Sequence, residues 1–289
     1  LVGELMNSGG ITKRLVNFAM VIVGHIRGGL AYVNVLTNMF LASIVGSANA
    51  QTAIMSRTII PEMERNGYSR DFSAALTAAA SIVGPLIPPS MPFIVYGVMA
   101  GQSIGNLFIA GIIPGILFGL AFSIMIYVIS LKRNFSRSEK SSFVLAIKSF
   151  LNVLPAVSIP VIIVWGILAG VFTPTESAAF AVLIALVIGL FIYRELKLSD
   201  LPKIFINTLL TSATVTFLIA VSNIFGWILT YEQIPKLVAD AVLNFAGSPL
   251  VFLLLANIIL LIVGLFIDGI AALILMVPIL LPIALQYGI

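Results

Sequence analysis

The chain alternates long apolar runs with short polar connections, and several runs are long enough to cross a bilayer as single helices. Four such runs cover residues 106–131, 150–172, 177–193 and 205–231. A bilayer core about 30 Å thick requires roughly 20 mostly apolar residues per spanning helix. The pattern therefore predicts an all-α polytopic membrane protein.

Residues 30–53 form a further apolar stretch, but it carries too many polar positions for a helix that faces lipid. These positions are Asn34, Asn38, Ser43, Gly46, Ser47, Asn49 and Gln51. Polar side chains within a membrane usually face protein or a water-filled cavity rather than hydrocarbon. We therefore expect a re-entrant helical hairpin in this stretch, with its tip at residues 46–48.

Two other apolar stretches are interrupted by helix breakers. Residues 72–100 contain a cluster of prolines, which are Pro85, Pro88, Pro89 and Pro92. Proline removes a helical N–H donor and clashes with the preceding turn, so we expect a discontinuous helix here. Residues 250–285 are too long for one crossing. They are interrupted at Asp268 and Gly269 and again at Pro278 and Pro282, so we interpret them as a second re-entrant hairpin.

Composition supports a membrane protein and indicates its sidedness. Hydrophobic residues make up 60% of the 289 and charged residues 9%, against roughly 25% charged residues in soluble domains. The net charge is +4, and most of the Lys and Arg residues lie in three loops, which the positive-inside rule places in the cytoplasm, so no nucleic-acid partner is needed. The loops carry Arg57, Arg65 and Arg70; Lys132, Arg133, Arg137, Lys140 and Lys148; and Arg194, Lys197 and Lys203.

The residues available for chemistry argue against an enzyme. The chain has no cysteine, and its single histidine, His25, lies in a polar connection without metal-binding partners nearby. It contains no HExxH, GxSxG or Walker A motif, which removes most support for proteolysis and ATP-driven transport. It begins at Leu1 without a basic signal-peptide region, and we expect it to be part of a longer protein.

The two expected hairpins are related by an internal repeat with an offset of 223 residues. Without a gap, the offset pairs Asn34 with Asn257 and Gly46 with Gly269, and an amphipathic segment precedes each hairpin, at residues 11–23 and 234–246. An odd number of expected crossings separates the hairpins, so they enter from opposite faces. This is an inverted-topology repeat, a build common among secondary transporters, which bind substrate and ions at discontinuous helices.

Broken membrane helices expose unpaired carbonyl groups at one end and N–H groups at the other, and these ends attract cations and anions respectively. We expect Na⁺ ligands at Ser43, Gly46, Ser47, Gly84, Pro88, Asp268 and Gly269, and substrate contacts from Ser47, Asn49, Ser90 and Asp268. Asp268 is the only acidic residue deep inside an apolar run. Na⁺ coordination, proton carriage, hydrogen bonding to substrate and simple helix capping all remain open to it.

Several motifs resemble the large membrane subunit of tripartite ATP-independent periplasmic (TRAP) transporters. The resemblance covers nearly the whole chain and includes residues 28–35, the tip at 46–48, the loop at 65–68, the break at 84–90, the Thr-Pro-Thr-Glu motif within residues 172–179, and residues 266–272. It implies a Na⁺-coupled importer of small organic acids, of the sialic acid or C4-dicarboxylate type, with an elevator mechanism in the bacterial inner membrane. It also implies a small four-helix membrane subunit and a periplasmic substrate-binding protein as partners, and no cofactor apart from Na⁺ as the coupling ion.

The family's ion and substrate residues match this chain at Gly46, Ser47, Gly84, Pro88, Ser90 and Asp268. Two departures stand near the first tip. Val45 occupies the place of a serine in the family's Ser-Gly-Ser motif, and Asn49-Ala50-Gln51 replaces the commoner Ala-Asp ending. A proline-rich partner of the second hairpin is expected near position 307, beyond Ile289.

The resemblance predicts five regions. Residues 1–29 hold the end of a scaffold helix and a cytoplasmic amphipathic arm, and 30–103 hold the first half of a transport domain. Residues 104–231 hold scaffold and connecting helices, 232–249 a periplasmic amphipathic arm, and 250–289 the incomplete second half. Alternatives are a stand-alone divalent-anion/Na⁺ symporter, an intramembrane enzyme using Asp268 and Glu176, and an inert scaffold.

Overall fold

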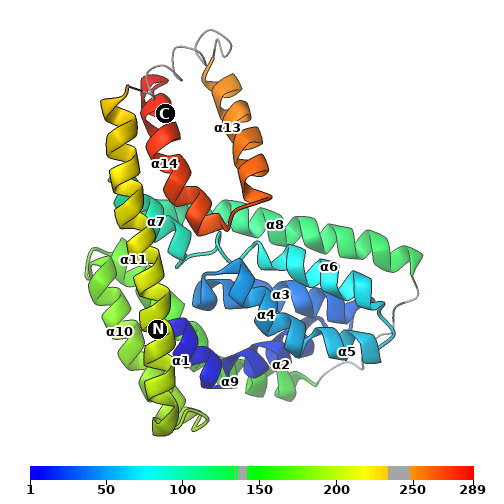
Figure 1. Cartoon of the computed structure of the whole chain (residues 1–289). Helices are drawn as coiled ribbons and strands as arrows, with labels where there is room; N and C mark the ends of the chain where they lie inside the picture. The colour runs from blue at the N-terminus through cyan, green and yellow to red at the C-terminus, as the bar shows by residue number, and fades with distance from the viewer. Residues whose placement is uncertain (134, 136–141, 234–247) are drawn as a thin grey trace. The chain divides into compact units, whose positions relative to one another are not determined.

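The computed structural model describes residues 1–133, 135, 142–233 and 248–289, and these residues fold into helices without a β-strand (Figure 1). The helices are α1 Val2–Ser8, α2 Ile11–Val23, α3 Gly29–Val45, α4 Ala48–Thr58, α5 Ile60–Arg65, α6 Arg70–Ser81, α7 Met91–Ala100, α8 Ile104–Lys132, α9 Phe143–Leu168, α10 Pro174–Val187, a π-helical turn Ile188–Ile192, a 3-10 turn Leu198–Asp200, α11 Leu201–Tyr231, α13 Pro249–Gly264 and α14 Gly269–Gln286. Residues 234–247 of the expected arm at 232–249 lie outside the described residues, as do Arg137 and Lys140 of one basic loop.

Five helical stretches among the described residues are long and apolar enough to cross a membrane. They are α8, α9, Pro174–Ile192, Leu198–Leu229 and α14. The first four coincide with the four expected spans, which confirms the multi-pass helical class. The expected start of the second span, at residue 150, lies too late. The helix begins at Phe143 because the Ser142 hydroxyl accepts a hydrogen bond from the Leu145 N–H, at 3.2 Å.

The proline cluster breaks its helix as expected, whereas two later prolines do not. Helix α6 ends at Ser81, residues 82–90 form consecutive turns, and α7 begins at Met91. By contrast, α14 runs without a break through Pro278 and Pro282. A single proline in a membrane helix costs one hydrogen bond and is tolerated where neighbouring groups compensate. The prediction that these two prolines interrupt the hairpin is therefore wrong, and the interruption lies at residues 265–268 alone.

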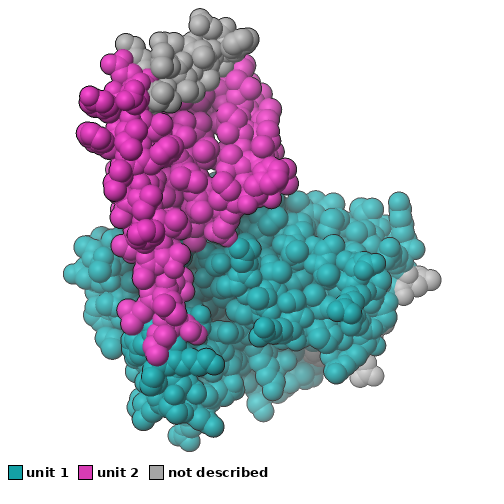
Figure 2. Space-filling view, in the orientation of Figure 1, with its two compact units in different colours: residues 1–93, 104–205 teal, residues 94–103, 206–289 magenta. Residues whose placement is uncertain are grey.

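The chain divides into two compact units (Figure 2), the first comprising residues Leu1–Phe93 and Ile104–Phe205 and the second Ile94–Ser103 and Ile206–Ile289. In the first unit, α3 packs on α2 and α6, and α2 also packs on α9. Fully buried side chains fill the space between these helices, among them Leu15, Val33 and Met63. The five functional regions expected from the sequence are a different division of the chain and stay a prediction.

A polar clamp in the first unit fixes α2 to the segment that follows the π-helical turn Ile188–Ile192. The Arg14 guanidinium forms an ion pair with Glu195 at 2.8 Å and lies 3.9 Å above the Tyr193 ring. The Tyr193 hydroxyl donates to the Asn152 carbonyl of α9 at 2.7 Å. Gly10 lies beside this clamp with φ of 73°, and a Cβ there would collide with the Glu195 carboxylate. Glycine suits this position because it adopts a positive φ without strain and has no Cβ to collide with Glu195.

In the second unit, α11, α13 and α14 make specific contacts. The Ser222 hydroxyl donates to the Ile274 carbonyl at 2.7 Å, where both groups are buried. A Cβ added at Gly226 would lie 3.2 Å from the Pro278 ring, so glycine permits close packing of α11 on α14. Helices α13 and α14 form a pair joined at residues 265–268, and the Phe252 and Tyr287 rings stack with centroids 5.2 Å apart.

Candidate functional site

The tip of the first hairpin is a tight turn between α3 and α4. Gly46 ends α3 with φ of 63°, a left-handed conformation that favours glycine, and its N–H donates to the Ala42 carbonyl at 3.1 Å. Ser47 caps α4, since its hydroxyl accepts from the Ala50 N–H at 3.4 Å. The C-terminus of α3 and the N-terminus of α4 therefore meet at two consecutive residues. The partial negative charge of the first helix end and the partial positive charge of the second lie side by side there.

This tip lies against the end of the broken helix. A Cβ built on Gly46 would lie 3.5 Å from the Met91 nitrogen and 4.0 Å from the Pro89 carbonyl oxygen. Within the break, the Gly84 N–H donates to the Ser81 carbonyl at 3.0 Å. The Ser90 hydroxyl donates to the Pro85 carbonyl, and Ser90 is fully buried. The structure thus brings Gly46, which Ser47 follows in the chain, next to the segment that holds Gly84, Pro88 and Ser90.

A buried ladder of polar side chains joins the hairpin to α6. Asn34 donates from Nδ2 to the Thr77 hydroxyl at 2.7 Å, and Asn38 donates to Asn34 Oδ1 at 2.8 Å. Asn38 Oδ1 in turn accepts from Gln51 Nε2 at 2.7 Å and from the Ser81 hydroxyl at 3.2 Å. All five side chains are fully buried. Because unsatisfied buried polar groups are costly, the ladder holds α3, α4 and α6 in one arrangement.

The ladder ends in an amide oxygen that points at the break. Gln51 Oε1 is buried and has no hydrogen-bond partner among the described residues. Its orientation follows from the ladder, because Gln51 Nε2 donates to both the carbonyl and the side-chain oxygen of Asn38. A Cβ at Gly84 would collide with Gln51 Oε1 and lie 3.0 Å from the Ser81 carbonyl oxygen. Two oxygens therefore face the space left by the missing side chain of Gly84.

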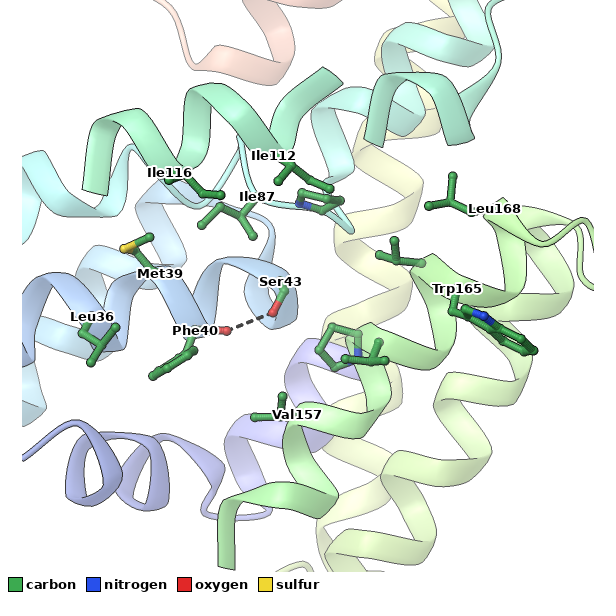
Figure 3. A pocket seen from close by; sticks show the side chains of 14 residues that line it. Leu36, Met39, Phe40, Ser43, Ile87, Ile112, Ile116, Val157, Trp165 and Leu168 are labelled. Carbon is green, nitrogen blue, oxygen red and sulfur yellow. Dashed lines mark hydrogen bonds between the residues drawn. The ribbon is translucent and has the colours of Figure 1, made fainter. Parts of the chain in front are cut away.

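The other residues predicted for the first half of the transport domain do not border the space beside Gly84. Ser43 and Pro88 line an apolar crevice beside the hairpin, where the Ser43 hydroxyl donates to the Phe40 carbonyl at 3.0 Å (Figure 3). Asn49 is exposed in the first turn of α4. The roles assigned to these residues in sodium and substrate binding stay predictions.

The residues predicted for the second half of the transport domain, Asp268 and Gly269, lie in the second unit. Asp268 caps α14, since its Oδ2 accepts from the Ile270 N–H at 3.1 Å, and the residue is exposed. Gly269 begins α14, and a Cβ there would meet no atom within 4 Å. Asp268 therefore does have the capping role that the sequence left open. That the two tips contribute to one ion and substrate site stays a prediction.

Sequence reasoning missed the part that α6 plays in this site. Ser73, Thr77 and Ser81 repeat every four residues along one face of α6, and all three are buried. That spacing is the signal that could have identified a polar face directed at the hairpin. In the described part of the chain there is no group of three or more His, Cys, Asp or Glu side chains suited to a metal ion. The polar groups gathered at the first tip and the break are hydroxyl, amide and carbonyl groups.

The ladder makes a specific prediction about stability. In Asn38→Leu, the Gln51 amide and the Ser81 hydroxyl lose the oxygen they share, and we expect the free energy of unfolding to fall by about 1–3 kcal/mol. The matched control is Asn257→Leu on α13, whose exposed amide donates only within its own helix, to the Leu253 carbonyl at 2.8 Å. Reversible unfolding in mixed detergent micelles measures both variants, and equal losses would contradict a special role for the ladder.

Comparison with known proteins adds independent information. The family model described as "Tripartite ATP-independent periplasmic transporter, DctM component" matches residues 1–289. The chain is 43% identical to the sialic acid TRAP transporter large permease protein SiaM of Vibrio cholerae over the whole chain and 68% of that protein. It is 40% identical to the sialic acid TRAP transporter permease protein SiaT of Haemophilus influenzae, of which it covers 47%. It is 39% identical to the C4-dicarboxylate TRAP transporter large permease protein DctM of Pseudomonas aeruginosa, of which it covers 68%.

Proposed function

Because the chain belongs to the DctM component family of tripartite ATP-independent periplasmic transporters, we propose that it serves as the large membrane subunit of a Na⁺-coupled importer of small organic acids. Membership confirms the resemblance seen in the sequence motifs. It also makes the chain part of a transporter rather than an enzyme, with a multi-pass location in the inner membrane.

The substrate class in this proposal is a small carboxylate. Two of the relatives are named for sialic acid and one for C4-dicarboxylates, and both classes are organic acids. The chain spans about half of SiaT and about two thirds of SiaM, so the proposal concerns the whole transporter to which it contributes. A small four-helix membrane subunit and a periplasmic binding protein are the proposed partners, and an elevator-type movement is the proposed mechanism.

The observation that carries the proposal is the contact between the first hairpin tip and the break. Gly46 lies near the Pro89 carbonyl, and Gln51 Oε1 and the Ser81 carbonyl face the space beside Gly84. Oxygen ligands without a dense cluster of carboxylates suit a weakly held monovalent cation. We place one Na⁺ among Gly46, Ser47, Gly84 and Pro88, with Gln51 as an added oxygen. Asp268 and Gly269, in the second unit, are proposed as further Na⁺ ligands.

The substrate is proposed to bind beside the same tip. The amide end of α4, capped by Ser47, attracts a carboxylate by its partial positive charge. Asn49, in the first turn of that helix, and Ser90 are the further proposed contacts at this tip, and Asp268 is proposed separately as a substrate contact in the second unit. The Ser90 hydroxyl must leave the Pro85 carbonyl before it can donate to a substrate, so its role requires a rearrangement of the break.

Uptake into proteoliposomes tests the coupling. The full-length protein, reconstituted with both partners, is expected to accumulate a radiolabelled organic acid only when the Na⁺ gradient points inward. Each 1.4 kcal/mol stored in that gradient supports about a tenfold concentration ratio of substrate. Uptake that is unchanged in Na⁺-free buffer would contradict the coupling. Undiminished uptake without the two partners would instead favour the stand-alone divalent-anion/Na⁺ symporter.

A further inference from the structure

A crevice of about 560 Å³ lies between the first hairpin, the break, α8 and α9 (Figure 3). Its volume falls within the roughly 300–1,000 Å³ typical of sites for small ligands. All of its lining residues belong to the first unit. Residues from the four elements include Phe40 and Ser43 of α3, Ile87 of the break, Ile116 of α8, and Val161 and Trp165 of α9.

The lining is unsuited to a charged substrate or to water. It contains no charged side chain, and its one hydroxyl, that of Ser43, already donates to the Phe40 carbonyl. A carboxylate in such surroundings would lose its hydration without finding a partner. A buried water requires two to four polar partners, which this lining does not supply. An apolar occupant fits this chemistry.

The position of the crevice along α9 matches the depth of a single leaflet. Lining residues on α9 extend from Val157 to Leu168, its last residue. At 1.5 Å per residue this is about 16 Å, or close to half of a bilayer core about 30 Å thick. Trp165 lies near the end of α9, as is typical of tryptophan at a membrane interface. The crevice therefore runs from the membrane interior to one interface.

The crevice is also open on the side of its two flanking spans. Side chains on both flanking spans are exposed, with 58% exposure at Val161, 63% at Trp165 and 48% at Ile116. Both α8 and α9 are long and apolar enough to cross the bilayer. Hydrocarbon chains can therefore reach the crevice laterally, between the two spans.

We propose that one acyl chain of a phospholipid occupies this crevice, from the leaflet in which α9 ends. Lipid tails are as apolar as leucine, so no hydrophobic driving force distinguishes the crevice from bulk lipid. The tail is held by van der Waals contacts that an empty crevice would forfeit. It touches both the hairpin arm at Phe40 and the break at Ile87, and so it supports the segment that carries the first tip. The proposal does not depend on Na⁺ coupling or on the substrate.

Photolabelling in lipid nanodiscs tests this site with the full chain. The probe is a phosphatidylethanolamine that carries a diazirine in the middle of one acyl chain, and adducts are located by peptide mass spectrometry. We expect adducts on Phe40 and Ile87. These should be lost in Ile116→Trp, whose larger side chain fills the crevice. They should persist in Leu117→Trp, because Leu117 lies at the same depth with 59% exposure but does not line the crevice.

A second pair of variants keeps the test decisive if Ile116→Trp fails to fold. Val161→Trp on α9 should also remove the adducts, whereas Leu151→Trp, equally exposed at 58% but outside the crevice, should keep them. Three results would overturn the proposal. These are the absence of adducts on Phe40 and Ile87 in the unaltered chain, adducts unaffected by either crevice variant, and crosslinking of a co-purified protein at these positions in place of lipid.

Discussion

Replacing Gly84 by alanine is expected to reduce Na⁺-driven uptake by roughly 5- to 150-fold, because the added methyl group costs about 1–3 kcal/mol in a site that has no room for it. The Cβ would collide with Gln51 Oε1 and lie 3.0 Å from the Ser81 carbonyl. Gln51 cannot move aside freely, since its amide is fixed to Asn38. The break must therefore shift away from the hairpin, and the proposed Na⁺ ligands separate.

A double variant distinguishes this clash from a general effect on folding. In Gly84→Ala combined with Gln51→Ala, the colliding amide is gone, so uptake should recover from the level of Gly84→Ala to that of Gln51→Ala alone, which lacks only the added oxygen proposed for Na⁺. The matched control is Gly264→Ala at the end of α13, where a Cβ would meet no atom within 4 Å. Initial uptake rates under an inward Na⁺ gradient are the measurement. An equal loss in the single and double variants would contradict the contact between Gln51 and Gly84 as the cause.

The features that sequence reasoning predicted well are those set by local backbone chemistry. Clustered prolines cannot continue a helix, so the break between Ser81 and Met91 follows from residue types alone. The tip at Gly46 follows in the same way, because a residue with φ of 63° favours glycine. The spans were recognised because hydrophobic length is a direct requirement of the bilayer. Each of these features is determined by the residue types in one continuous segment of the chain.

The features that it missed depend on contacts between distant segments. Asn38 and Ser81 are 43 positions apart, and their hydrogen bond joins two helices whose pairing no local pattern specifies. The wrong prediction for Pro278 and Pro282 has the same cause. Groups around α14, and not its own sequence, compensate for the hydrogen bonds that these prolines remove. The oxygen of Gln51 at the break likewise emerged only from the folded arrangement. Gln51 belongs to the segment that departs from the family pattern, and its oxygen faces Gly84 in the folded chain.

Asp268→Asn is expected to lower Na⁺-driven uptake to the level measured without Na⁺, while leaving the protein folded. Asp268 has an observed role as a helix cap and a proposed role as an ion ligand, and this change separates the two. Its carboxylate caps α14 by accepting from the Ile270 N–H at 3.1 Å, and asparagine caps helices about as well as aspartate. The substitution therefore keeps the cap and removes the negative charge. If that charge binds the coupling ion, the Na⁺ dependence is lost although α14 still forms.

The control for this variant is Asp200→Asn, because Asp200 also accepts from a backbone N–H, that of Lys197 at 3.1 Å, and belongs to the short 3-10 turn Leu198–Asp200 rather than to either tip. Uptake by Asp200→Asn should equal that of the unaltered chain. Asp268→Ala removes cap and charge together, so it should also weaken folding by about 0.5–2 kcal/mol. Normal Na⁺-dependent uptake by Asp268→Asn, combined with a defect in Asp268→Ala, would reduce Asp268 to a structural cap. The ion would then be held by oxygens without formal charge.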